Sequence, residues 1–125
     1  MWRENAIKKL KEADYRLTPQ RLKLLEVLGD IGGDHPSLSE LLDEIRREFP
    51  TMGFSTLYSN LLTLRELGLV ELFSFGGETR VEVNTRPHLN LIEGRRIIDL
   101  NDPGIIDAIR RKTGKKVKLV NVLVE

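Results

Sequence analysis

Few residues in this chain of 125 could act as reactive groups. There are two histidines, His35 and His88, and no cysteine. Without a thiol there can be no disulfide, no cysteine-ligated zinc site and no thiol nucleophile. The sequence contains no Gly-rich phosphate loop, no HExxH motif and no recognisable pair of nucleophile and base. The lack of these groups argues against an enzyme, and we expect a function based on binding.

Charged residues are unevenly distributed, although their total is nearly balanced. Residues 1–25 carry seven Lys or Arg against three Asp or Glu, whereas residues 26–84 carry four against eleven. Residues 85–125 are basic again, with nine against five. A nucleic-acid-binding protein needs only one basic face, so the net charge of +1 does not exclude that function. Taken alone, the same charges also suit ordinary solvated helix faces.

The composition indicates a soluble globular chain that forms one domain or two small ones. With 40% apolar residues and 31% charged residues of mixed sign, the chain is unlike a disordered one. No apolar stretch approaches the roughly 20 residues that span a bilayer. The first residues, Met1-Trp2-Arg3-Glu4-Asn5, lack the apolar run of a signal peptide. Together with the lack of cysteine, these features predict a cytoplasmic protein.

Hydrophobic spacing predicts three or four short helices followed by a β-hairpin in the first 84 residues. The expected helices span 2–14, 19–28, 38–49 and 56–67. Thr18 and Pro19 suit the start of the second helix, Ser37 and Glu40 form a capping box for the third, and Ser55 could cap the fourth. The β-rich runs 69–75 and 79–84 meet at Gly76-Gly77, a hairpin signal. Short helices that end in a hairpin are typical of a winged helix-turn-helix.

A different pattern begins after Pro87. The runs 89–92 and 95–100 flank a second turn signal, and Asn101-Asp102-Pro103 begins a helix expected to bury Ile105, Ile106 and Ile109. A last strand over 117–124 is apolar on both faces and needs cover on each side. Forty residues in β-β-α-β order bury little surface alone, so a second copy is the simplest cover. We therefore expect an α+β chain, with a winged-helix domain over 1–84 and a dimerisation domain over 85–125.

Five short motifs occur in a characteristic order along the chain. They are Arg16-Leu17-Thr18-Pro19-Gln20-Arg21, His35-Pro36-Ser37, Ser55-Thr56-Leu57-Tyr58, Glu66-Leu67-Gly68-Leu69-Val70 and Gly76-Gly77. Their arrangement resembles the ferric uptake regulator (Fur) family of metal-responsive transcription factors, and the similarity covers nearly the whole chain. The resemblance implies a homodimeric repressor that reads a palindromic operator in double-stranded DNA and is switched by a divalent metal.

The resemblance places base reading on the helix that begins near Ser55, because a groove-inserted helix reads bases with its exposed N-terminal residues. Its expected reading residues are Ser55, Thr56, Tyr58, Ser59 and Thr63. Tyr58 matches the family's base-contacting tyrosine, whereas Ser59 stands where the family often has arginine. Phosphate contacts are expected from Lys8, Lys9, Lys11, Arg16, Arg21 and, on the wing, Arg80. The alternative for each of these basic residues is a side chain that is solvated and contacts no phosphate.

The resemblance also implies a regulatory metal site. His35, Glu82, His88 and Asp99 match its ligand positions and would suit one ion of Zn, Fe, Mn or Ni per subunit. The family's two Cys-x-x-Cys pairs are absent, so no structural four-cysteine zinc is expected. The alternative is that His35 bonds only to backbone and His88 is an ordinary strand residue, which would leave a constitutive DNA-binding protein.

A second class of function also fits a winged helix. The acidic surplus over 26–84 suits a protein–protein adaptor of the transcription machinery that has no operator of its own. Four acidic residues of the third expected helix lie opposite its apolar stripe and could face away from a duplex. They are Glu40, Asp43, Glu44 and Glu48. Enrichment of particular duplexes from a random pool would separate the two classes, because an adaptor should enrich none.

Overall fold

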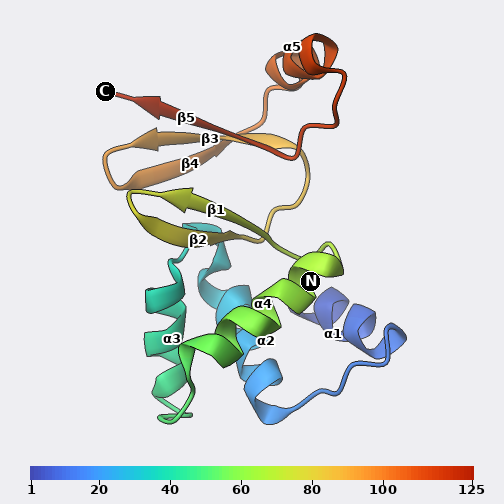
Figure 1. The fold of residues 1–125 in the computed structure, drawn as a ribbon, viewed down its shortest axis with the longest axis vertical. Coiled ribbons are helices and arrows are strands. Elements are labelled where there is room, and N and C mark those ends of the chain that lie inside the picture. Colours follow the sequence, from blue (N-terminus) through green and yellow to red (C-terminus); the bar gives the residue numbers. More distant parts are fainter. The chain divides into compact units, whose positions relative to one another are not determined.

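The computed structural model describes all residues from 1 to 125 and has an α+β fold. The chain divides into two compact units, Met1–Asn84 and Thr85–Glu125 (Figure 1). The first unit is helical and ends in a two-stranded hairpin, and the second has the β-β-α-β order. The predicted fold class, a winged helix-turn-helix followed by a small β-β-α-β module, is thereby confirmed. None of the helices has the length and apolar character needed to cross a bilayer.

Four α-helices and one short 3-10 helix form the first unit. They are α1 (Trp2–Glu12), α2 (Pro19–Ile31), η1 (Gly32–Asp34), α3 (Leu38–Arg46) and α4 (Phe54–Glu66). Their apolar faces meet in one core, in which Ala6, Leu41, Ile45 and Leu61 are fully excluded from solvent. The indole of Trp2 donates a hydrogen bond to the Leu69 carbonyl (3.1 Å), which ties α1 to the segment after α4. Burial of these apolar stripes holds α4 in place.

The helix starts agree with the predictions in α2 and α3 but not in α4. The Thr18 hydroxyl accepts from the Arg21 amide (3.2 Å), and the Ser37 hydroxyl accepts from the Glu40 amide (3.1 Å). The cap of α4 is Gly53, in an extended conformation, so the prediction that Ser55 caps this helix was wrong. Glycine is an accepted N-cap residue, and the earlier start places Phe54 and Ser55 within the first turn.

The wing consists of β1 (Glu71–Phe75) and β2 (Glu78–Glu82), which pair antiparallel. The turn residues Gly76 and Gly77 have φ values of +61° and +79°, a conformation that glycine adopts without steric cost and that a tight hairpin requires. The base of the wing is attached to the loop before α3, since the Val81 amide donates to the Pro36 carbonyl (2.9 Å). The wing is therefore anchored at the loop that carries His35.

The second unit is a three-stranded sheet with one helix. Its elements are β3 (His88–Glu93), β4 (Arg96–Leu100), α5 (Pro103–Thr113) and β5 (Leu119–Val124). The strand order is β4-β3-β5, with β3 antiparallel to β4 and parallel to β5, so α5 is the crossover between β4 and β5. Ile106 is buried, but Ile105 is 42% exposed, which corrects the prediction that both face inward. Ile105 and Ile106 point about 100° apart around the helix axis, and Ile106 is the one that faces the interior.

Gly32 allows a close approach between η1 and the end of the wing. A Cβ atom at Gly32 would lie 2.7 Å from Val83 Cγ1, whereas one at Gly33 would meet nothing within 4 Å. We therefore expect Gly32→Ala to lower the free energy of unfolding by about 1–3 kcal/mol, the usual cost of overpacking. The matched variant Gly33→Ala should be neutral or slightly stabilising. Urea unfolding followed by circular dichroism checks this, and equal midpoints for the two variants would contradict it.

Candidate metal-binding and DNA-reading residues

His35 has an unusual backbone conformation that is held by several contacts. It follows η1 with φ of +53°, in the left-handed region, where histidine is more common than most residues. Its amide donates to the Gly32 carbonyl (3.2 Å), and Arg80 Nη1 donates to the His35 carbonyl (2.9 Å). The side chain is buried, with 2% of the residue exposed. These contacts fix the direction in which the imidazole leaves the backbone.

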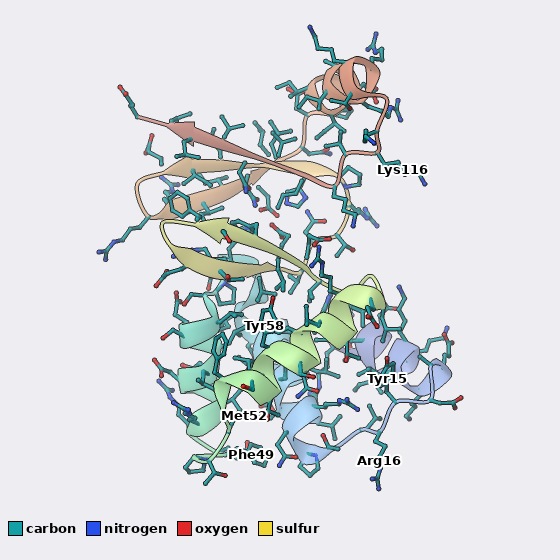
Figure 2. All side chains as sticks on the ribbon, in the orientation of Figure 1. Tyr15, Arg16, Phe49, Met52, Tyr58 and Lys116 are labelled. Atoms are coloured by element: carbon teal, nitrogen blue, oxygen red, sulfur yellow. The ribbon has the colours of Figure 1, made fainter.

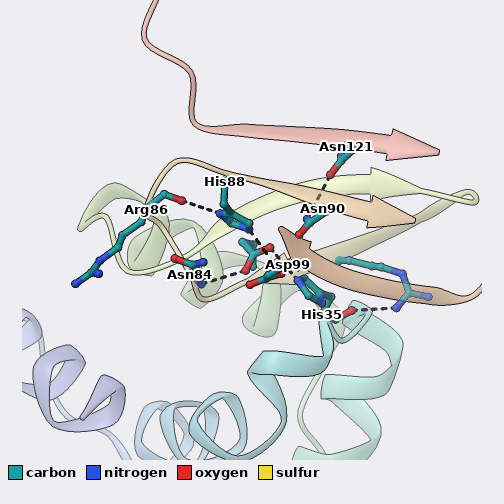
Figure 3. A network of polar contacts seen from close by, with 9 residues as sticks. His35, Asn84, Arg86, His88, Asn90, Asp99 and Asn121 are labelled. Carbon is teal, nitrogen blue, oxygen red and sulfur yellow. Dashed lines mark hydrogen bonds and ion pairs between the residues drawn. The ribbon is translucent and has the colours of Figure 1, made fainter. Parts of the chain in front are cut away.

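The buried imidazole of His35 lies against a buried carboxylate from the wing. His35 Nε2 is 3.0 Å from Glu82 Oε2, and both side chains are 3% exposed or less (Figure 3). The other carboxylate oxygen accepts from the Asn84 amide (3.1 Å), and the Phe73 ring meets the imidazole edge to face at a centroid distance of 6.2 Å. Burying a carboxylate is costly unless it is paired, and this pair satisfies that condition within one unit. The same two groups are common metal ligands.

A second histidine–carboxylate pair lies in the other unit. His88 Nδ1 is 2.7 Å from the Arg86 carbonyl, which can only accept, so Nδ1 carries the proton (Figure 3). In the neutral ring Nε2 is then an acceptor, and it lies 3.7 Å from Asp99 Oδ1. Two acceptors that face each other are suited to a shared cation or proton. Metal-ligating histidines commonly donate their other N–H to a carbonyl in this way.

The exposed face of α4 carries hydroxyl and aromatic side chains. Ser55, Thr56 and Ser59 are exposed, and Tyr58, labelled in Figure 2, is 39% exposed. Thr63 is half-buried and its hydroxyl donates to the Ser59 carbonyl (3.3 Å), so it offers less to a ligand. The opposite face buries Leu57, Leu61 and Leu64 in the core. Most of the predicted reading residues are therefore brought together on one accessible surface.

The arginines near this surface differ in how free their guanidinium groups are. Arg16 is exposed in the loop before α2 (Figure 2). Arg21 is engaged within the unit, since Nε donates to Asn60 Oδ1 (2.9 Å), Nη1 donates to the Arg16 carbonyl (3.0 Å) and the group covers the Tyr15 ring. Arg21 thus links α2 to α4. Asn60 is not among the residues predicted from the sequence, and its only signal there is a polar residue on the α4 side that otherwise faces the core.

Arg80, the predicted DNA contact on the wing, is largely enclosed. Its side chain is 15% exposed, it donates to the His35 carbonyl, and Nη2 lies 3.2 Å from Glu78 Oε2. Arg80 therefore holds the wing against the His35 loop. The first-helix lysines are more accessible: Lys8 and Lys11 are exposed and Lys9 is half-buried.

An open pocket of about 410 Å³ lies at the N-terminal ends of α2 and α4. Its lining includes the two predicted contacts Arg16 and Arg21, together with Thr18, Thr56 and Asn60, and contains no acidic residue. Helix N-termini and arginines both favour anions. The local charge at this end of α4 is therefore opposite to the acidic average of residues 26–84.

Comparisons with known proteins identify the family. The sequence model of the ferric uptake regulator family matches residues 12–125. The chain is 56% identical over 125 residues to a ferric uptake regulation protein homolog of Archaeoglobus fulgidus, covering 100% of this chain and 98% of that protein. It is 33% identical over 105 residues to the peroxide operon regulator of Bacillus subtilis, covering 82% of this chain and 72% of that protein.

Solved structures agree with these sequence matches. The Vibrio cholerae ferric uptake regulator superposes with a TM-score of 0.69 at 26% identity, covering 94% of this chain and 97% of that one. Members of this family are dimeric DNA-binding regulators and not enzymes, which supports the prediction of a regulator over that of an adaptor. On the sequence match and the shared fold together, this chain belongs to the ferric uptake regulator family of metal-responsive transcriptional regulators.

Proposed function

We propose that this protein is a cytoplasmic repressor that binds a palindromic operator as a homodimer and is switched by one divalent metal ion per subunit. The observation that supports DNA reading most directly is the accessible face of α4, which carries Ser55, Thr56, Tyr58 and Ser59 beside the pocket lined by Arg16 and Arg21. In this proposal residues 1–84 bind DNA and residues 85–125 form the dimer. The exposed apolar side chains of β5 support that assignment, since Leu123 is 69% exposed.

The DNA contacts fall into two classes. We assign base reading to Ser55, Thr56, Tyr58 and Ser59, with Thr63 at the edge of the contact. Backbone contacts are assigned to the accessible basic residues, which are Lys8, Lys9, Lys11 and Arg16. Arg21 and Arg80 are held by internal hydrogen bonds, so their main role in this proposal is to position α4 and the wing, with a shared phosphate contact as a second role.

We assign the regulatory metal to the two histidine–carboxylate pairs, His35 with Glu82 and His88 with Asp99. Two imidazoles and two carboxylates suit Zn, Fe(II), Mn or Ni. The orientation of His88, with its Nδ1 proton held by a carbonyl, supports a ligand role for Nε2. A bound ion would supply charge and fixed coordination geometry. Ligands drawn from both units would restrict the orientation of the DNA-binding heads, so metal would shift a conformational population.

Selection of bound duplexes from a random pool, with and without divalent metal, tests the whole proposal. We expect enrichment of a palindrome that depends on metal, because a twofold dimer reads two inverted half-sites. For the selected duplex, log affinity should fall linearly with log salt, with a slope of about −0.9 per phosphate contact. Fluorescence anisotropy between 50 and 300 mM salt measures the slope. Binding that does not respond to salt, or no enrichment, would contradict the proposal.

A further inference from the structure

We propose that Phe54, which forms an exposed apolar ridge on α4 with Tyr58 and Leu62, reads a thymine methyl group and is a specificity-determining residue. The inference rests on the proposed function, since it specifies what the DNA-reading helix recognises. Thymine is the only base that presents a methyl group in the major groove, and apolar side chains such as phenylalanine read that group by contact. The ligand is therefore a duplex with thymines at the positions that face α4.

The ridge is visible in the spacing and exposure of three residues. Phe54, Tyr58 and Leu62 recur every four residues along α4, so they lie along one side of the helix. Their exposed fractions are 53%, 39% and 36%, although all three have large apolar side chains. The Phe54 and Tyr58 rings are nearly parallel, at 13°, with centroids 6.0 Å apart. The two rings therefore present a continuous apolar surface at the N-terminal end of the helix, where base contacts are made.

The polar groups of α4 leave few other means of reading bases. The helix has no charged side chain before Arg65, and Arg65 Nε is 2.8 Å from Glu71 Oε1. The one amide side chain, Asn60, accepts from Arg21. The common bidentate contacts of arginine to guanine and of asparagine to adenine are thus not offered by the exposed face. Serine and threonine hydroxyls bond to several bases, so the apolar ridge is what can distinguish one base from another.

The occupant of this surface is a nucleic acid rather than an apolar protein segment. The pocket beside the start of α4 is lined by Arg16 and Arg21 and has no acidic lining residue, a charge that suits the phosphate backbone on either side of a groove. Apolar contacts within a positively charged border match the chemistry of a thymine-containing major groove.

Replacing thymine by uracil in the selected operator tests the inference, because the change removes the methyl group and keeps base pairing. At the position under Phe54, uracil should weaken wild-type binding about fourfold per half-site, the value of burying one methyl-sized group, and about fifteenfold in both half-sites. Phe54→Ser should bind the thymine duplex more weakly and should no longer distinguish uracil from thymine there. Phe54→Leu, which keeps an apolar side chain, should retain part of the discrimination.

The outcomes separate this inference from the proposed function. If the wild type binds its operator but tolerates uracil at the position under Phe54, Phe54 does not read a methyl group, whereas DNA binding stands. If Phe54→Ser weakens the thymine and uracil duplexes equally, Phe54 only supports the helix and the inference fails. If Phe54→Ser leaves DNA binding unchanged, Phe54 makes no contact with the duplex and the inference also fails. Thermal unfolding of Phe54→Ser, whose site is exposed at the helix start, verifies that the variant is folded.

Discussion

Glu82→Gln is expected to lower the affinity for the regulatory metal by at least about 100-fold, because loss of even an outer-shell partner costs 10–100-fold. The substitution keeps the size of the side chain and an oxygen that can accept from the Asn84 amide, but it removes the ligand charge beside His35. Isothermal titration of metal-free protein with Zn(II) and Mn(II) measures the effect. Asp43→Asn, which removes an exposed carboxylate of α3, is the matched control and should titrate as the wild type does.

The loss of metal affinity in Glu82→Gln should also appear in the free energy of unfolding measured with metal present. Saturating metal at 1,000 times the dissociation constant stabilises a folded protein by about 4 kcal/mol, so the wild type should unfold at clearly higher urea when metal is added. Glu82→Gln should show little of this gain at the same metal concentration. Asp99→Asn in the second unit should behave similarly if both pairs hold one ion. Two independent ions per subunit, or unchanged affinity in both variants, would contradict the shared site.

Leu123→Lys is expected to convert the dimer into monomers at micromolar concentration. Leu123 is 69% exposed on β5, which pairs with β3 and has no second neighbour within the chain. An apolar edge strand is a template for pairing with another chain, and a lysine is the residue with which natural proteins block such edges. Sedimentation velocity over a concentration series measures the change. Asn101→Lys, which adds the same charge at an exposed position of the same unit, should remain dimeric.

The affinity for operator DNA should fall when Leu123→Lys dissociates the dimer. Linked binding of two half-sites exceeds single-site affinity by factors of 10²–10⁴, so Leu123→Lys should bind a palindrome at least about 100-fold more weakly. Affinity for an isolated half-site should be unchanged, because α4 lies in the other unit. A Leu123→Lys protein that stays dimeric would show that β5 is not the interface. A monomer that binds the palindrome as tightly as the wild type would contradict recognition of the two half-sites by a twofold dimer.

Local signals predicted most of the fold. The Ser37–Glu40 capping box and the Gly76-Gly77 hairpin turn are formed by neighbouring residues, so their chemistry is readable from short sequence windows. The start of α4 was placed late because serine is the stronger capping residue, whereas the chain uses Gly53 in an extended conformation. The outward position of Ile105 depends on how α5 packs in its unit, and three candidate isoleucines in one helix do not settle it.

Less of the candidate site than of the fold could be predicted from the sequence. The resemblance indicated His35, Glu82, His88 and Asp99 as ligands. That His35 lies against Glu82, and His88 near Asp99, is known only from the fold. The hydrogen bond from Arg80 to the His35 carbonyl joins residues far apart in the sequence, and nothing near Arg80 indicates it. Likewise, the exposure of Phe54 depends on the whole helical core, because phenylalanine is more often buried than exposed and nothing adjacent in the sequence indicates its outward position. Long-range contacts of this kind determine which polar groups remain available to a ligand.

The positive φ of His35 limits which substitutions evolution can accept at that position. Glycine, asparagine and aspartate tolerate this region, whereas β-branched and bulky residues are strained there by steric conflict with their own backbone. A single-nucleotide change converts a histidine codon to asparagine or aspartate without added backbone strain, whereas the other products, such as tyrosine, leucine and proline, are strained at this φ. A relative that had lost the proposed metal site would therefore be expected to carry asparagine or aspartate at this position.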